Sequence, residues 1–229
     1  MPDGDLLYRI AIWLVPLVIA IVFHEVAHGW VARAFGDPTA ARLGRLTLNP
    51  IKHVDPVGTV GLPLLLAVTG APVFGWAKPV PVVTSRLRNP RLHMMLVALA
   101  GPGINLVLAL VAALGLGVLL AGNGGVEPTG GVRFLVDNLF NFLLINVFLA
   151  IFNLIPLPPF DGGHVVEGLL PRSVVPTWQG LGRFGFPILI VLLLVVPMIS
   201  PEWNVVARAV VPIVHMVAGA FLGLVGLAI

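Results

Sequence analysis

The chain of 229 residues contains no cysteine, and only 10% of its residues are charged, compared with about 25% in an ordinary soluble domain. Without cysteine, the protein has no disulfide, no thiolate metal ligand and no cysteine nucleophile. The serines are Ser85, Ser173 and Ser200, and none stands in a Gly-x-Ser-x-Gly pattern, which argues against a serine protease. So low a charge content excludes a soluble enzyme, a disordered chain and a nucleic-acid-binding domain.

Apolar residues make up 58% of the chain, and the mean hydropathy is +1.04. One small globule cannot hide so large an apolar surplus, so most of it is predicted to face a lipid bilayer. The net charge is +3 and the isoelectric point about 10.2. With so few charges, these values indicate basic cytoplasmic loops of a membrane protein, and no nucleic-acid partner is expected.

Five apolar stretches are predicted to span the membrane: residues 6–35, 92–121, 134–156, 184–199 and 205–228. The stretch 57–70 is shorter than a span, at about 14 residues, and basic residues stand on both sides of it. A re-entrant or short helical segment is therefore favoured, with a true span as the alternative. Residues 74–84 alternate and contain two prolines, so they are predicted to form a small membrane-associated β-hairpin.

The charges also predict an orientation. With five spans, loops 36–91 and 157–183 share one side and hold most of the lysines and arginines, whereas Arg9, Arg133 and Arg208 lie on the other. The positive-inside rule then places the N-terminus outside and these loops in the cytoplasm of a cell-membrane protein. The N-terminus lacks the basic region of a cleaved signal peptide, so the first span is expected to be retained.

The first apolar run ends in His24-Glu25-x-x-His28. On a helix, residues i and i+4 share one face, so His24 and His28 can present two imidazoles to one ion. Zinc suits two neutral imidazoles and a third, oxygen ligand. Glu25 lies about 100° round the helix, close to the metal without being needed as a ligand, and can act as a general base towards water. The alternative is a solvated polar helix end.

Asp161 is the candidate for the third ligand. It follows the third apolar stretch and the prolines 156, 158 and 159, which end that helix. Gly162 and Gly163 come next and permit close approach of the backbone. A carboxylate on irregular backbone beside a membrane helix suits a buried site. The alternative is an Asp-Gly turn or a helix N-cap.

The segments HEVAHGW, FGWAKPVPV, AGPGIN and NLIPLPPFDGGH together resemble the site-2 protease family, the compact bacterial type without PDZ or CBS domains. The resemblance implies one Zn²⁺ per chain held by His24, His28 and Asp161, with Glu25 as general base. It also implies that Asn153 binds substrate or stabilises the oxyanion. Gly101 and Asn105 match a small-residue and amide pattern on the family's next core helix.

The family's fold implies an all-α polytopic membrane protein: a three-helix catalytic core and two C-terminal spans, with the small β-hairpin and the re-entrant or short helical segment. The 229 residues form one integral-membrane peptidase domain, with the core at about 6–170 and a C-terminal helical hairpin at about 180–229. The implied activity is cleavage of transmembrane segments within the bilayer by water that a glutamate activates. The implied substrates are single-span regulatory proteins or remnant signal peptides, and the active site faces the cytoplasm.

Several polar residues carry weaker predictions. His164 is expected either to hydrogen-bond a metal ligand or only to cap a helix, and Gly162, Val80 and Val82 are candidates for supporting the site or binding substrate. Asn138 and Asn141 favour interhelical hydrogen bonds, and His53 is expected at the surface because it follows a lysine in a loop. Two other functions remain open: a metal transporter and a non-catalytic relative that binds membrane partners. The oligomeric state is open too.

Overall fold

A computed structural model describes residues 6–69, 75–124, 126–204 and 206–227, and every regular element within these ranges is a helix. Four helices are long and apolar enough to cross a membrane: α1 (Leu6–Ala34), α4 (Pro90–Gly122), α5 (Gly130–Asn153), and Val206–Gly223, which comprises the π-helix η6 (Val206–Val210) and α9 (Val211–Gly223). The predicted all-α polytopic fold is confirmed, and the chain is a multi-pass integral membrane protein.

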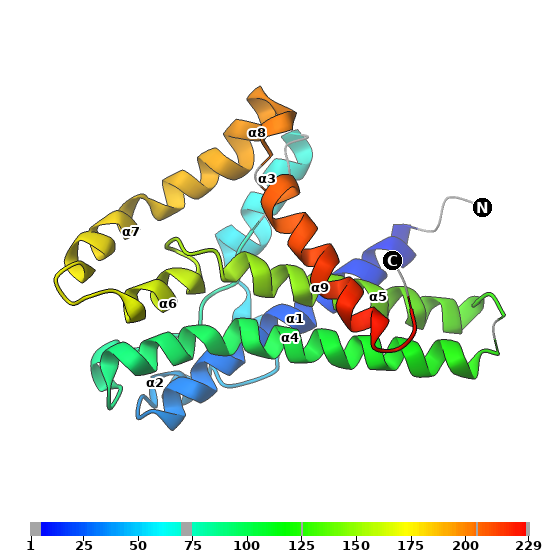
Figure 1. Cartoon of the computed structure of the whole chain (residues 1–229), viewed down its shortest axis with the longest axis horizontal. Helices are drawn as coiled ribbons and strands as arrows, with labels where there is room; N and C mark the ends of the chain where they lie inside the picture. The colour runs from blue at the N-terminus through cyan, green and yellow to red at the C-terminus, as the bar shows by residue number, and fades with distance from the viewer. Residues whose placement is uncertain (1–5, 70–74, 125, 205, 228–229) are drawn as a thin grey trace.

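Helices α1, α4 and α5 all contact one another and form the body of the bundle, and α9 lies obliquely across α4 and α5 (Figure 1). The interface of α4, α5 and α9 is apolar and rich in small side chains, among them Ala109, Ala113 and Ala218. Alanines let membrane helices approach closely. Large apolar side chains such as Trp13 and Val118 are exposed instead, as lipid-facing residues should be.

The remaining helices are short. They are α2 (Thr39–Arg42), η1 (Pro50–His53), η2 (Pro56–Gly61), α3 (Leu62–Thr69), η3 (Thr84–Arg86), α6 (Asp161–Leu169), α7 (Val175–Ile190), η4 (Val191–Val195), α8 (Val196–Ile199) and η5 (Pro201–Trp203). The predicted span 184–199 falls on the succession α7, η4 and α8, which diverges from the bundle (Figure 1). That it crosses the bilayer stays a prediction.

The apolar stretch 57–70 is helical wherever the structure describes it, in η2 and α3, while Gly70 lies outside the described residues. Asp55 begins this segment, since its carboxylate accepts hydrogen bonds from the backbone N–H groups of Val57 and Gly58. The prediction of a short helical segment agrees with this structure.

The predicted β-hairpin at 74–84 is wrong. Phe74 lies outside the described residues, residues 75–83 form neither strand nor helix, and Thr84 begins the short 3-10 helix η3. The reason lies in the backbone donors. Trp76 and Lys78 donate to carbonyls of Gly58 and His53, two later N–H groups donate to carboxylates, and the two prolines have no N–H to offer. No ladder of strand hydrogen bonds can therefore form. We call residues 75–83 the extended segment.

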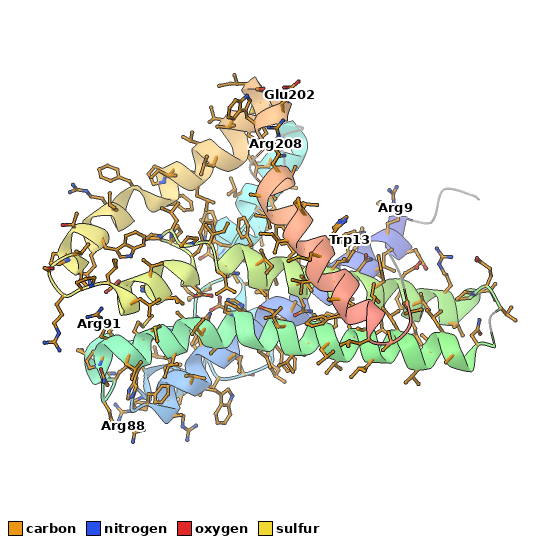
Figure 2. The ribbon with its side chains drawn as sticks, viewed as in Figure 1. Arg9, Trp13, Arg88, Arg91, Glu202 and Arg208 are labelled. Atoms are coloured by element: carbon orange, nitrogen blue, oxygen red, sulfur yellow. The ribbon has the colours of Figure 1, made fainter. Side chains whose placement is uncertain are left out.

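Arginines lie at both ends of α1, and the side of the membrane that each end faces stays a prediction. Figure 2 shows Arg88 and Arg91 at the end where α1 stops and α4 begins, and Arg9 at the opposite end of α1. His24 and His28 lie in the last turns of α1, and so nearer the end that carries Arg88 and Arg91.

Asp37 ties the extended segment to the end of α1. Its carboxylate is fully buried and accepts hydrogen bonds from the backbone and side chain of Thr39 and from the N–H of Val83 at 2.7 Å. Burial of Asp37 opposes its charged form, but these hydrogen bonds and the nearby charge of Arg86 outweigh it and hold the pKa of Asp37 below its ordinary value.

Replacing Asp37 with Asn is expected to destabilise the protein by about 1–3 kcal/mol, because an amide cannot satisfy all these donors. Because its folded-state pKa is lowered, Asp37 stabilises the fold fully above its unfolded pKa near 3.8 and loses this effect as the pH falls through the folded value. Thermal unfolding in detergent should therefore show a difference at pH 7 that shrinks in acid. The exposed Glu202 provides a control, since Glu202→Gln should change the unfolding temperature little at either pH.

Candidate metal centre

Three potential metal ligands converge towards the C-terminal end of α1, which is the end predicted to face the cytoplasm. His24 and His28 project from one face of that helix, and Asp161 is the first residue of α6. Nε2 of His24 lies 3.1 Å from Nε2 of His28 and 3.2 Å from Oδ2 of Asp161, which in turn lies 3.4 Å from Nε2 of His28. Within the described ranges, no other group of metal-binding side chains comes together in this way.

The hydrogen bonds of the two imidazoles determine which nitrogen carries the proton. Nδ1 of His24 lies 2.6 Å from Oδ1 of Asn105, and Nδ1 of His28 lies 2.7 Å from the carbonyl of Val97. Both oxygens are acceptors, so each Nδ1 is the donor, and each neutral ring presents an unprotonated Nε2.

The centre of the cluster therefore gathers acceptors only. Two imidazole lone pairs face a carboxylate oxygen, and Oδ2 of Asp161 is buried without a hydrogen-bond partner among the described residues. Acceptors this close repel one another unless a cation lies among them. Two neutral imidazoles and one carboxylate are a donor set that zinc accepts in catalytic sites, so the residues fit a zinc ion.

A network of amides orients His24. Asn105, from α4, is fully buried, and its Nδ2 donates to Oδ1 of Asn146, from α5, at 2.7 Å and to the carbonyl of Ala20 at 3.3 Å. Because that amide group is used as a donor, Oδ1 of Asn105 remains the acceptor for His24. Such partners fix the ring and tautomer of a ligating histidine. Asn146 stands seven residues before Asn153 and so shares its helix face, but the sequence does not reveal its contact with Asn105.

Gly101 leaves the space that the imidazoles occupy. A Cβ atom at this position of α4 would lie 2.5 Å from Cε1 of His24 and 2.5 Å from Nε2 of His28. Glycine is thus required here by close approach rather than by an unusual backbone conformation. This gives the predicted small residue a physical reason.

The turn before α6 presents Asp161. Helix α5 ends at Asn153, and the chain then folds back so tightly that a side chain at Gly162 would collide with the carbonyls of Leu154 and Ile155. Trp178, from α7, donates its indole N–H to the carbonyl of Gly163 at 3.0 Å. A cavity of about 610 Å³ adjoins this turn, between the first turns of α4, α6 and α7.

Glu25 is half-buried and lies beside the two histidines in sequence, and the extended segment reaches it. The N–H of Val80 donates to Oε2 of Glu25 at 2.7 Å. Among the described residues, Oε1 makes no hydrogen bond. One carboxylate oxygen is thus held and the other is free, which is the arrangement that a general base needs.

The structure places the other predicted residues away from direct contact with the cluster. The amide of Asn153 donates to the carbonyl of Leu149, in its own helix, at 3.0 Å. His164 is exposed, with Nδ1 3.8 Å from Oε2 of Glu167. Val82 packs beside a small cluster around Val97. Roles for Asn153, His164 and Val82 stay predictions.

The predicted surface position of His53 is wrong. Its side chain is 3% exposed, because Nε2 donates to the carbonyl of Thr47 at 2.9 Å, within the loop that joins α2 to η1. A neighbouring lysine indicated solvent, but this hydrogen bond allows the ring to be buried.

Comparison with known proteins agrees with this geometry. Over 180 residues the chain is 41% identical to YwhC of Bacillus subtilis, which its name describes as a candidate zinc metalloprotease, and the match covers 78% of each chain. The family model for peptidase family M50 matches residues 132–196. The chain belongs to peptidase family M50, the site-2 protease family.

Two mycobacterial proteins, both named Rip2, are also similar in sequence to this M50 peptidase. Their names likewise describe them as candidate zinc metalloproteases. The protein of Mycolicibacterium smegmatis is 33% identical over 83% of this chain and 68% of its own length, and that of Mycobacterium tuberculosis is 35% identical over the same shares. No solved structure matches the chain. As an M50 peptidase, the protein is a zinc-dependent membrane metalloendopeptidase.

Proposed function

We propose that this protein is an intramembrane endopeptidase that hydrolyses peptide bonds in the transmembrane segments of membrane proteins. One observation carries the proposal: His24, His28 and Asp161 offer three converging acceptors. Glu25 follows His24 in the chain, and among the described residues one of its carboxylate oxygens makes no hydrogen bond. We propose these three residues as the zinc ligands and Glu25 as the general base.

Zinc supplies Lewis acidity towards the scissile carbonyl and the attacking water. Oε1 of Glu25 takes one proton from water while the oxygen of that water bonds to the carbonyl carbon of the substrate. When the carbon–nitrogen bond breaks, Glu25 gives that proton to the leaving amine, so the carboxylate is regenerated. A positioned acid–base group of this kind contributes about 10²–10⁴-fold to the rate.

The oxyanion that forms on the substrate needs hydrogen-bond donors. Asn153, as the last residue of α5, is our candidate for such a donor. In other proteases one such donor contributes about 2.7–4 kcal/mol. For Asn153 to act as this donor, its amide must give up its hydrogen bond to the carbonyl of Leu149 and donate to the substrate instead.

The substrate must lose its helical hydrogen bonds before it can be cut, because a helix has no exposed backbone to attack. The cavity of about 610 Å³ next to the turn of Asp161 offers room for an unwound segment. We propose single-span regulatory proteins or remnant signal peptides as substrates. We also propose that all 229 residues act as one peptidase domain in the cell membrane, with the site at the cytoplasmic end.

Metal removal tests this function. In proteoliposomes with a single-span model substrate, 1,10-phenanthroline should slow cleavage about tenfold or more, because the Lewis acid is lost, and added zinc should restore it. The isomer 1,7-phenanthroline does not chelate and serves as the control. Mass spectrometry of the products should locate the cut within the apolar segment. Cleavage that survives chelation, or cuts confined to soluble loops, would contradict the proposal, and zinc uptake without cleavage would favour the transporter.

A further inference from the structure

Arg45 is buried although it has no acidic partner. It follows α2, and its side chain is 8% exposed, yet among the described residues no carboxylate lies within ion-pair distance of it. Burying an unpaired guanidinium is costly. The cation must therefore do something that an apolar side chain could not.

Its contacts are with the extended segment. Nη2 of Arg45 donates to the carbonyl of Lys78 at 2.7 Å and to the carbonyl of Pro79 at 3.3 Å. The next backbone N–H, that of Val80, donates to Oε2 of Glu25 at 2.7 Å. The carbonyl of Pro79 and the N–H of Val80 belong to one peptide group, so Arg45 and Glu25 are bonded to opposite edges of the same plane.

The charges at the two edges match the dipole of that peptide. The oxygen, which is its negative end, faces the guanidinium, and the N–H, its positive end, faces the carboxylate. Hydrogen bonds in such a chain polarise one another. The side chain of Val80 also packs closely on α1, where Gly29 leaves room for it: a Cβ at Gly29 would lie 2.9 Å from Cγ1 of Val80.

We propose that Arg45 is a positioning residue for Glu25. Through the Pro79–Val80 peptide it fixes Oε2 of the base and thereby aims Oε1 at the attacking water. The inference rests on the proposed function, because it assigns no role to Arg45 unless Glu25 is the base. It also assigns the extended segment a role, that of holding Glu25 in position, and this role does not require the segment to form a strand.

The test uses the full-length enzyme in proteoliposomes. Arg45→Met should lower kcat about tenfold, a fraction of the whole contribution of an acid–base group, with KM and zinc content unchanged. Arg45→Lys retains a cationic donor and should recover most of kcat. In a Glu25→Gln background, Arg45→Met should cause no further loss, because the group that it positions is already gone.

A second pair of variants leaves Arg45 in place. Val80→Pro removes the N–H group that donates a hydrogen bond to Glu25. Ala77→Pro is the matched control, since the N–H of Ala77 makes no hydrogen bond with any described residue. Only Val80→Pro should lower kcat. The proposal fails if the two prolines have equal effects, if Arg45→Met leaves kcat unchanged, or if its loss persists in the Glu25→Gln background. Full cleavage by Glu25→Gln alone would instead overturn the proposed function.

Discussion

Replacing Gly101 with alanine is expected to weaken zinc binding by at least about 10–100-fold and to reduce proteolysis with it. The added methyl group would lie 2.5 Å from atoms of both His24 and His28, well inside van der Waals contact, and α4 is too tightly packed against α1 to retreat. The imidazoles must turn away from Asp161. Changes in the groups that support metal ligands weaken binding about 10–100-fold, so we expect at least this loss of zinc affinity.

The chain offers a matched control two residues away. A Cβ at Gly103, on the same helix, would meet no atom within 4 Å, and alanine is the better helix former by about 0.8–1.0 kcal/mol. Gly103→Ala should therefore bind zinc and cleave substrate as the wild type does. Zinc content by elemental analysis and cleavage rate should be measured on each preparation. Normal zinc binding by Gly101→Ala would show that the metal lies elsewhere.

Local features of the sequence predict the three proposed ligands. The spacing of His24 and His28 places both on one helix face whatever surrounds them, and prolines followed by glycines mark Asp161 as the start of a new element. Their convergence in space is the additional fact that the structure supplies, since Asp161 lies on a different helix.

The extended segment could not be predicted in the same way. Its alternation predicted a strand, but two of its N–H groups donate to the carboxylates of Glu25 and Asp37, 55 and 46 positions earlier in the chain. No local pattern reveals such partners. For the same reason Arg45, which reads as one more basic loop residue, gave no sign that it is buried.

Glu25→Gln is the second variant with a large expected effect. Glutamine is nearly isosteric and can still accept a hydrogen bond from Val80, so the fold and the three ligands should be undisturbed. It cannot take a proton from water, and the cleavage rate should fall about 10²–10⁴-fold. Glu127→Gln, in the exposed loop between α4 and α5, changes charge in the same way and should have no effect.

The most direct test of the zinc site and its base is to measure zinc content and cleavage on one preparation of Glu25→Gln. The proposed mechanism predicts about one zinc per chain, as in the wild type, with cleavage reduced at least about 100-fold. Cleavage at the wild-type rate would contradict the role of Glu25. Loss of zinc would contradict the assignment of His24, His28 and Asp161 as the complete set of protein ligands.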